Sequence, residues 1–361
     1  MKMVKADGAG LEEAVRVLKA GGVAVIPTDT VYGLAAHPDC PEAVARLSSL
    51  KGRPSDKPIA LLASDVMAVE NFLGGLEAQP RRLAKLHWPG ALTLVLPSSN
   101  GTFEGVRVPN HVFTRELISR CGGVLRVTSA NESGCAPATD AALTFENVGL
   151  GADIVVDDGL SPGGEASTVA KSDKGELVLL REGPVAFNVL ASASPRRAKI
   201  LRDHGVDFIV VKTDVEEVIY PGDPGRTVRE NALAKGAAVK SRGHVIAADT
   251  IVWLNGKIYG KPRDLDEARA FLRELSGNVH SVYTAVVCDG DVKTVRSDVA
   301  FRVLPDEVIE DYVTRVCPLD RAGAYDIDDS GFNLISSYSS GGYENIMGLP
   351  VEPLREWGIV S

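Results

Sequence analysis

The chain has 361 residues and a formal net charge of -9, and 45% of its residues are hydrophobic while 24% are charged. This composition is typical of a folded protein without disordered tracts, and the length predicts two domains of ordinary size. The negative charge argues against a general attraction to nucleic acid or to an anionic membrane, so any nucleotide contact must come from a local basic pocket.

The cysteines and the N-terminal segment indicate the cellular compartment of the protein. Five cysteines lie far apart and form no CxxC pair, which argues for reduced thiols and against a disulfide framework or a zinc site. The N-terminus lacks the apolar segment of a signal peptide, and no apolar run approaches membrane-spanning length. We therefore expect a cytoplasmic protein that does not enter a membrane.

Strands and helices alternate along the first half. Leu11, Val15 and Leu18 recur at helical spacing, and the Gly21-Gly22 pair ends that helix. A second helix is predicted over 41–51, and a pair of strands before Gly183-Pro184 closes the domain. This alternation predicts a mixed α/β fold. Further buried strands are predicted at 23–27, 58–64, 91–97, 124–130 and 152–158.

Polar clusters interrupt this pattern. Lys51, Arg53 and Lys57 are cations within seven residues, and Gly52 and Pro54 keep a helix from spacing them apart. They suit a triphosphate, although a solvated basic helix end has the same composition.

Small hydroxyl and amide side chains form two other polar clusters. Ser129 and Asn131 end a buried strand, where α/β sheets bind ligands, although ordinary turns favour the same residue types. Thr30 and Tyr32, in PTDTVYGL (27–34), leave a choice between ligand contact and buried core hydroxyls.

In this order, the segments resemble the threonylcarbamoyl-AMP synthase (YrdC-like) family over most of residues 10–185. The matching strings also include HWPGALTLVL (87–96), VRVP (106–109), STV (167–169) and LREG (180–183). The resemblance implies a twisted open sheet with a concave basic face. It also implies synthesis of L-threonylcarbamoyladenylate and pyrophosphate from L-threonine, bicarbonate and ATP, for threonylcarbamoyladenosine modification of tRNA alongside other modification proteins.

No protein nucleophile is needed for that reaction, because the threonine amine and its carboxylated form supply the reacting groups. The protein must position them and balance the phosphate charge. The resemblance implies that ATP and threonine are bound by Thr30, Tyr32, Lys51, Arg53, Lys57, Arg107, Ser129, Asn131, Ser167 and Arg181.

The second half is again α/β, with no repeat of the first. Strands are predicted at 188–192, 245–254 and 279–288, and Asn255-Gly256 predicts a hairpin from the second of them into 257–261. Helices are predicted at 264–277 and 306–316. The change of pattern near residue 186 predicts domains of 1–186 and 187–361.

Residues 189–200 (VLASASPRRAKI) contain the parts of an anion site. Ser194 is a good N-cap and Pro195 suits a first helical turn, so a helix should begin there. Its free N–H groups, with Arg196 and Arg197 beside them, suit a polyphosphate. A capped surface helix with two solvated arginines is the alternative.

Carboxylates and lysines follow this segment. Asp249 ends an apolar strand and, with Glu217, suits a hard divalent cation such as Mg²⁺ or Mn²⁺. Asp249 could also orient or deprotonate a water molecule. Lys235 and Lys261 would add positive charge around phosphates. Read alone, Glu217 is better explained as a solvated loop acid and Lys235 as a solvated helix residue.

As an ordered set, these residues resemble the Maf-like nucleotide pyrophosphatases over 188–360, through strings such as LASASPRR, DVEE, LAKGAA, GKPRD and ENIMGLP. The resemblance implies metal-dependent hydrolysis of a nucleoside triphosphate to the monophosphate and pyrophosphate, and a homodimer. It makes Asp249 the proton acceptor and, with Glu217, a metal ligand. Thr250 would lie by the base. The phosphates would be bound by Ser194, Arg196, Arg197, Lys235 and Lys261.

The preferred base is left open. Pyrimidine-directed members have a glutamine where this chain has Asp328, and a carboxylate only accepts hydrogen bonds, which suits guanine or 7-methylguanine. RAGAY (321–325) instead resembles the pyrimidine (dTTP/UTP) branch.

The leading hypothesis is a fused bifunctional enzyme. The alternative makes one half a non-catalytic module that binds RNA or regulates cell division. The intact cation and polar motifs favour two enzymes, because a scaffold needs no convergent phosphate-binding cations, and the negative charge disfavours a dedicated RNA binder.

Overall fold

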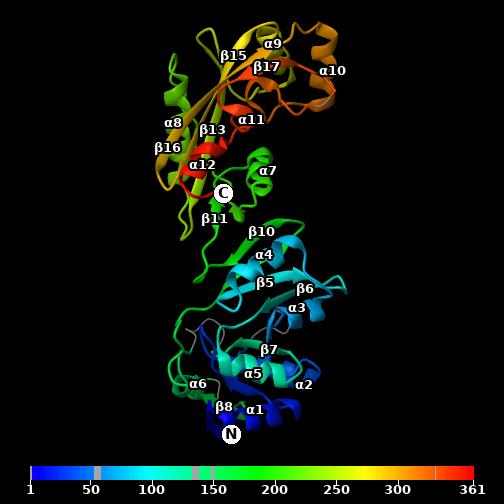
Figure 1. Cartoon of the computed structure of the whole chain (residues 1–361), viewed down its shortest axis with the longest axis vertical. Coiled ribbons are helices and arrows are strands. Elements are labelled where there is room, and N and C mark those ends of the chain that lie inside the picture. Colours follow the sequence, from blue (N-terminus) through cyan, green and yellow to red (C-terminus); the bar gives the residue numbers. More distant parts are fainter. Residues whose placement is uncertain (1, 53–57, 132–137, 148–150, 330) are drawn as a thin grey trace. The chain divides into compact units, whose positions relative to one another are not determined.

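The computed structural model describes residues 2–52, 58–131, 138–147, 151–329 and 331–361. The chain divides into two compact units, Met1–Ala186 and Phe187–Ser361, hereafter the first and second units. Each unit carries its own sheet with helices packed on it, which confirms the predicted mixed α/β class (Figure 1). Among the described residues, no helix combines the length and apolarity needed to span a bilayer.

The described part of the first unit forms a ten-stranded sheet in the order β1-β8-β2-β3-β7-β4-β6-β5-β9-β10. Parallel and antiparallel pairs are mixed within it. Its strands are β1 (Lys2–Lys5), β2 (Ala24–Ile26), β3 (Gly33–Ala36), β4 (Leu61–Ala63), β5 (Leu92–Pro97), β6 (Phe103–Arg107), β7 (Val124–Ser129), β8 (Ile154–Asp157), β9 (Thr168–Asp173) and β10 (Glu176–Arg181). Its helices are α1 (Gly8–Lys19), α2 (Pro41–Leu50), α3 (Val66–Leu73), α4 (Ala78–His87), α5 (Val112–Arg120) and α6 (Ala141–Asn147).

The apolar run at 23–26 is explained by burial on both faces of this sheet. Ala24 and Ile26 pack into a cluster with α1 and α5, whereas Val23 and Val25 pack into a cluster with α2. Successive strand side chains point to opposite faces, so a strand covered on both sides has no position for a polar residue.

A glycine lets β3 and β7 approach closely. Gly33 pairs with Ser129, and a Cβ at Gly33 would lie 2.6 Å from Cγ1 of Val127. The pairing continues past the strand ends, where the N–H of Ala130 donates to the carbonyl of Tyr32 at 2.8 Å. The polar segments that flank the two strands are thereby brought side by side.

The second unit is built on a sheet in the order β12-β11-β13-β15-β16-β17, with β14 paired to β13. The predicted hairpin is confirmed, with Asn255 and Gly256 at φ 48° and 85° as its turn requires. The strands are β11 (Asn188–Leu190), β12 (Phe208–Val210), β13 (Val245–Leu254), β14 (Lys257–Tyr259), β15 (Val279–Cys288), β16 (Asp291–Phe301) and β17 (Ile335–Ser339). The helices are α7 (Pro195–Asp203), α8 (Pro224–Ala237), α9 (Leu265–Leu275), α10 (Asp306–Val316), α11 (Gly342–Ile346) and α12 (Val351–Glu356).

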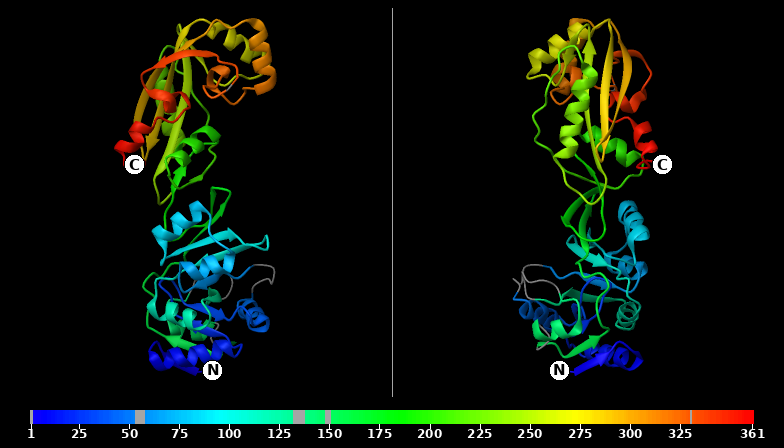
Figure 2. Two further views of the ribbon diagram at one scale, coloured as in Figure 1. Left: turned by 45° about the vertical axis from the view of Figure 1, so that its right-hand side comes forward. Right: turned by 90° about the vertical axis from the view of Figure 1, so that its left-hand side faces the viewer.

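Helices cover both faces of this sheet. Gly236 brings α8 onto the face that carries Ala247 and Val287, and Figure 2 shows α8 lying along these strands. On the opposite face, Ile246 and Ala248 pack with α7 and α12, while Val252 and Leu254 further along β13 pack with α9 and α10. Position 250, on the same face between these two apolar clusters, holds a threonine.

One edge of β13 is unpaired on either side of Thr250. On the side of β11 and β14, its residue pairs stop at Ile246 and resume at Val252. Side chains from both faces of the strand can therefore reach one opening, and backbone groups along that edge need partners from elsewhere.

Candidate functional sites

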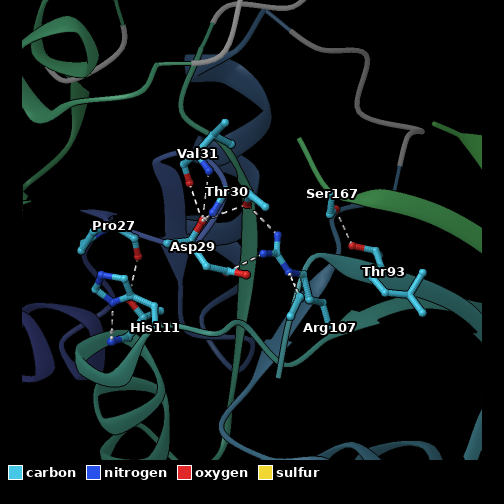
Figure 3. Close-up of polar contacts among 12 residues, drawn as sticks. Pro27, Asp29, Thr30, Val31, Thr93, Arg107, His111 and Ser167 are labelled. Atoms are coloured by element: carbon cyan, nitrogen blue, oxygen red, sulfur yellow. Dashed lines mark hydrogen bonds and ion pairs between the residues drawn. The ribbon is translucent and has the colours of Figure 1, made fainter. Parts of the chain in front are cut away.

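Arg107, at the end of β6, binds the loop that follows β2 (Figure 3). Its Nη1 donates to Oγ1 of Thr30 at 2.8 Å, its Nη2 to Oδ1 of Asp29 at 2.5 Å, and its Nε to the carbonyl of Gly90 at 2.8 Å. Burial lowers the pKa of the Arg107 guanidinium, and the negative charge of Asp29 opposes that shift. Arg107 therefore holds the 28–31 loop in place.

The same loop is braced from within. The hydroxyl of Thr28 donates to the carbonyl of Val31 at 2.6 Å and accepts from the backbone N–H of Thr30 at 3.1 Å. Both Thr28 and Thr30 are buried, and their hydroxyls lie 3.0 Å apart. Thr30 thus belongs to a rigid polar loop at the end of β2.

Lys51 joins two of the predicted clusters. It follows α2, and its Nζ lies 2.7 Å from the carbonyl of Ser129, 3.0 Å from its Oγ and 3.1 Å from Oδ1 of Asn131. Only 6% of Lys51 is exposed, so its charge is held firmly at the end of β7. Arg53 and Lys57 lie outside the described residues.

Ser167 and Arg181 form a neighbouring pair. The Arg181 Nη2 donates to the carbonyl of Ser167 at 2.7 Å, and the Ser167 hydroxyl lies 2.8 Å from that of Thr93 (Figure 3). Desolvation and the positive charge of Arg107 both lower the pKa of Arg181. Two guanidiniums therefore repel each other here, and an anion would relieve that repulsion.

Tyr32 is fully buried, and its hydroxyl is satisfied by backbone. It donates to the carbonyl of Gly159 at 2.7 Å and accepts from the N–H of Asp158 at 3.0 Å. Burial raises the pKa of its phenol. The sequence left open whether the Tyr32 hydroxyl contacts a ligand or is a buried core hydroxyl. These hydrogen bonds are those of a buried core hydroxyl.

Sequence reasoning missed Asp29 and His111 in this unit. Asp29 is the charged partner of Arg107, and its place inside PTDT was the available signal. His111 is the N-cap of α5 and its Nε2 lies 2.9 Å from Oδ2 of Asp158. Nothing in the sequence around His111 singles it out.

The second unit contains a cavity of about 400 Å³ beside the unpaired edge of β13. It brings together residues from α7, α8, β13 and the segments around 213–217, 260–261, 320–327 and 346–348. The predicted residues that line it are Ser194, Arg196, Arg197, Glu217, Lys235, Asp249, Thr250 and Lys261.

Helix α7 begins at Pro195 with Ser194 in the N-cap position, as predicted, but the Ser194 side chain makes no capping hydrogen bond. Ser194 therefore occupies the N-cap position without using its hydroxyl. The backbone N–H of Ser194 instead donates to Oγ of Ser192 at 3.2 Å, so the loop is held by the preceding serine.

The two neighbouring arginines have different surroundings. Arg197 uses all of its nitrogens within the protein: Nε donates to the carbonyl of Gly348, Nη1 to that of Ala248, and Nη2 to the Thr250 hydroxyl, at 2.7–3.0 Å. It therefore provides a partner for the Ala248 carbonyl in the stretch of β13 that pairs with neither β11 nor β14. Arg196 instead contacts Asp320, at 2.9 Å from Oδ2.

Asp249 lies under α8. Its Oδ1 accepts from Nζ of Lys235 at 2.6 Å, and Nδ2 of Asn231 lies 3.3 Å from its Oδ2. The same Lys235 nitrogen is 2.6 Å from Oε1 of Glu217. Burial raises the pKa of Glu217, but its bond to Lys235 and the nearby cations outweigh that and lower it overall.

The residues present fit a divalent cation. The carboxylates of Glu217 and Asp249 each lie 2.6 Å from the Nζ atom of Lys235, so their oxygens converge on the position of one positive charge. Only 5% of Asp249 is exposed, so its carboxylate is held in a fixed position. Carboxylate oxygens of this kind suit a hard ion such as Mg²⁺ or Mn²⁺.

The remaining predicted residues differ in their placement. Lys261 is exposed at the cavity, and no described group hydrogen-bonds to it. Thr250 bonds Arg197 and lies 3.1 Å from the Thr284 hydroxyl. Asp328 is exposed, lies outside the lining and accepts a hydrogen bond from Tyr343.

Sequence reasoning gave no role to several acidic and aromatic residues of the lining. Asp326 lies 3.7 Å from Nε of Arg196, and burial raises the pKa of this carboxyl. Tyr325 is buried against His280, 2.7 Å from its Nε2. Their presence in RAGAYDID was the available signal.

Two family models match the chain. The Sua5/YciO/YrdC model, described as telomere recombination, matches residues 16–183, and the model described as Maf-like protein matches 188–357. A dTTP/UTP pyrophosphatase of Thermosipho melanesiensis is 39% identical over 176 residues, or 48% of this chain and 95% of that protein. A dTTP/UTP pyrophosphatase of Desulfitobacterium hafniense is 43% identical over 202 residues, or 51% of this chain and 90% of that protein.

Among solved structures, P. abyssi Sua5 in complex with L-threonine matches with a TM-score of 0.50 and 27% identity. The match covers 60% of this chain and 64% of that one, so this chain spans just under two thirds of that protein. Both resemblances drawn from the sequence are confirmed. The chain belongs to two families in series, with a Sua5/YciO/YrdC domain at 16–183 followed by a Maf-like domain at 188–357.

Proposed function

We propose that the chain is a bifunctional enzyme: the first unit makes L-threonylcarbamoyladenylate for tRNA modification, and the second hydrolyses a nucleoside triphosphate to the monophosphate and pyrophosphate. The observation that carries the proposal is that each unit brings a largely buried lysine together with polar or acidic side chains from distant segments. Lys51 with Ser129 and Asn131 does so in the first unit. Lys235 with Glu217 and Asp249 does so in the second.

In the first unit, the side chains of Lys51, Ser167 and Arg181 suit the positioning of substrates and the balancing of charge. The threonine carbamate attacks the α-phosphorus of ATP, and pyrophosphate leaves. Lys51 supplies a fixed cation, and the Arg181 guanidinium beside Ser167 supplies a second position for an anion. Such groups act by holding the two substrates together and by stabilising the developing negative charge. The relative with bound L-threonine supports the choice of amino acid.

In the second unit, water attacks the α-phosphorus and pyrophosphate again leaves. Asp249 accepts the proton of that water, and its carboxylate is oriented by Lys235 and Asn231. Arg196 and Lys261 face the cavity and are suited to the phosphates. Glu217 and Asp249 would hold a divalent cation, which when bound supplies charge neutralisation at the phosphates.

We infer that the preferred substrates are dTTP and UTP. The two relatives with 39% and 43% identity are named dTTP/UTP pyrophosphatases, and this chain covers nearly all of each. Asp328, the residue that favoured guanine, lies outside the cavity lining. The reason for expecting a purine therefore loses its structural support.

The test incubates purified protein with Mg²⁺ and each nucleoside triphosphate in turn, and measures the monophosphate. We expect dTTP and UTP to be hydrolysed fastest, and Asp249→Asn to abolish hydrolysis, while the exposed control Asp266→Asn leaves it unchanged. Asp328→Gln should leave the ranking of nucleotides as it is. A preference for GTP or 7-methyl-GTP that disappears in Asp328→Gln would reverse the assignment of the base.

A further inference from the structure

Three metal-ligating side chains of different kinds meet at the end of the second unit's sheet, away from the cavity. They are His244, which precedes β13, Cys288 at the end of β15 and Asp289 in the turn to β16. A nitrogen, a sulfur and an oxygen from these residues all lie within 4.8 Å of one another.

The backbone fixes this arrangement. β13 and β15 pair with Ile246 opposite Cys288, so the start of one strand lies beside the end of the other. Asp289, at φ 52°, forms the tight turn with Gly290, and its Oδ1 accepts the N–H of Val245 at 2.9 Å. Asp289 is thereby tied to β13 next to His244.

A hydrogen bond accounts for two of the three residues. The Nδ1 of His244 lies 2.6 Å from Oδ2 of Asp289, and both side chains are about half exposed. It does not account for the sulfur. Cys288 is 5% exposed, its sulfur lies within 4.8 Å of the Asp289 carboxylate, and Asp291 is its partner across the turn. These carboxylates make the surroundings of the sulfur attractive to a cation.

We propose that His244, Cys288 and Asp289 form a second metal site, for a thiophilic divalent ion of the Zn²⁺ class. A mixed sulfur, nitrogen and oxygen set suits zinc, whereas the carboxylates of Glu217 and Asp249 suit magnesium. Water would complete a four-coordinate set, because Asp291 pairs with Cys288 across the turn but its carboxylate is not among the atoms that lie within 4.8 Å of one another.

The geometry requires only small movements. Zinc lies about 2.0–2.3 Å from such ligands, so bound ligand atoms are roughly 3.5 Å apart. His244 and Asp289 would separate slightly and Cys288 would stay in place, which is feasible because the first two are exposed. The thiol gives up its proton to solvent as the metal–sulfur bond forms. The expectation from the sequence that these cysteines hold no zinc considered only Cys–Cys spacing.

The test uses Co²⁺ as a spectroscopic probe on the full-length chain, in excess Mg²⁺ to fill hard oxygen sites. We expect a thiolate-to-cobalt charge-transfer band that Zn²⁺ abolishes. The band should persist in Cys317→Ser, which removes the other free cysteine of this unit, and in Asp249→Asn. It should be lost in Cys288→Ser.

A second variant guards against misfolding of Cys288→Ser. His244 is exposed, so His244→Ala should keep the fold, as circular dichroism would verify, and should weaken Co²⁺ binding at least tenfold. Loss of an outer-shell partner alone costs about 10–100-fold in metal affinity, so loss of a ligand should cost no less. Absence of the band in the wild type, its survival in folded Cys288→Ser, or unchanged affinity in His244→Ala would overturn the site.

Discussion

At the scale of single residues, the cations of this chain differ in whether their N–H groups already donate hydrogen bonds within the protein. Arg107 and Arg197 donate hydrogen bonds to protein groups, whereas Lys261 lies at the cavity with no described partner. The first kind shapes a site, and the second is available to a ligand. The sequence SPRR cannot show that Arg197 donates only to protein groups inside the unit whereas its neighbour Arg196 pairs with the exposed carboxylate of Asp320.

This division predicts different consequences for Arg196 and Arg197. Arg197→Ala leaves the carbonyls of Gly348 and Ala248 without their partner, so it should cost about 3 kcal/mol of unfolding free energy. Arg196→Ala breaks a partly exposed pair and should cost less than about 1 kcal/mol, while raising KM for the triphosphate about tenfold. Urea unfolding and steady-state kinetics measure the two effects. Equal loss of stability in both variants would contradict the assignment.

A buried histidine predicts a pH dependence of stability. Only 1% of His280 is exposed, none of the described residues hydrogen-bonds to its Nδ1, and burial lowers its pKa from 6.5 to about 4. Between these values the unfolded chain binds the proton and the folded chain does not. Stability is therefore complete above pH 6.5 and falls as the pH drops toward 4, by up to about 3 kcal/mol.

Calorimetry of the wild type and His280→Gln at pH 7 and pH 5 measures this contribution. The wild type should lose more stability than the variant on acidification, in the transition of the second unit. An equal loss in both proteins would remove His280 as the cause.

At the scale of elements, the apolar and strongly periodic segments could be predicted from the sequence. β15 was expected at 279–288 and is observed at Val279–Cys288, and α10 was expected and observed at 306–316. β16 was not expected, because Lys293, Arg296 and Asp298 break any apolar run. It forms because it pairs with β15 along its whole length.

Other boundaries depend on tertiary structure. The strand expected at 58–64 is confined to Leu61–Ala63. The residues of β3 overlap a polar motif in the sequence that does not predict a strand. They form one because they pair with β2 on one side and with β7 on the other. The contact of Lys51 with Ser129 joins segments 78 residues apart, and only the family resemblance anticipated it.

The close approach of β3 and β7 gives a prediction for Gly33. In Gly33→Ala the new Cβ would press on Val127, so we expect a cost of about 1–3 kcal/mol and separation of the segments that carry Tyr32 and Ser129. Threonylcarbamoyladenylate synthesis should fall and dTTP hydrolysis should not. Gly8→Ala, at a helix start with open space around it, is the matched control and should change neither. Wild-type synthesis in Gly33→Ala would show that the approach is not needed.

At the scale of the whole molecule, the described apolar clusters each draw their residues from one unit. The clusters around α1 and α2 belong to the first unit, and those around α7 and α9 to the second. Each unit thus has the core that an independent domain requires. The central claim is that each also has its own active site, with chemistry that does not depend on the other.

The most direct test follows both products in one reaction that contains ATP, L-threonine, bicarbonate, dTTP and Mg²⁺. Lys51→Ala should lose threonylcarbamoyladenylate and keep dTMP formation, Asp249→Asn should do the reverse, and the exposed control Lys19→Ala should keep both. If either Lys51→Ala or Asp249→Asn, shown to be folded, lost both products, the account of two separate sites would be contradicted.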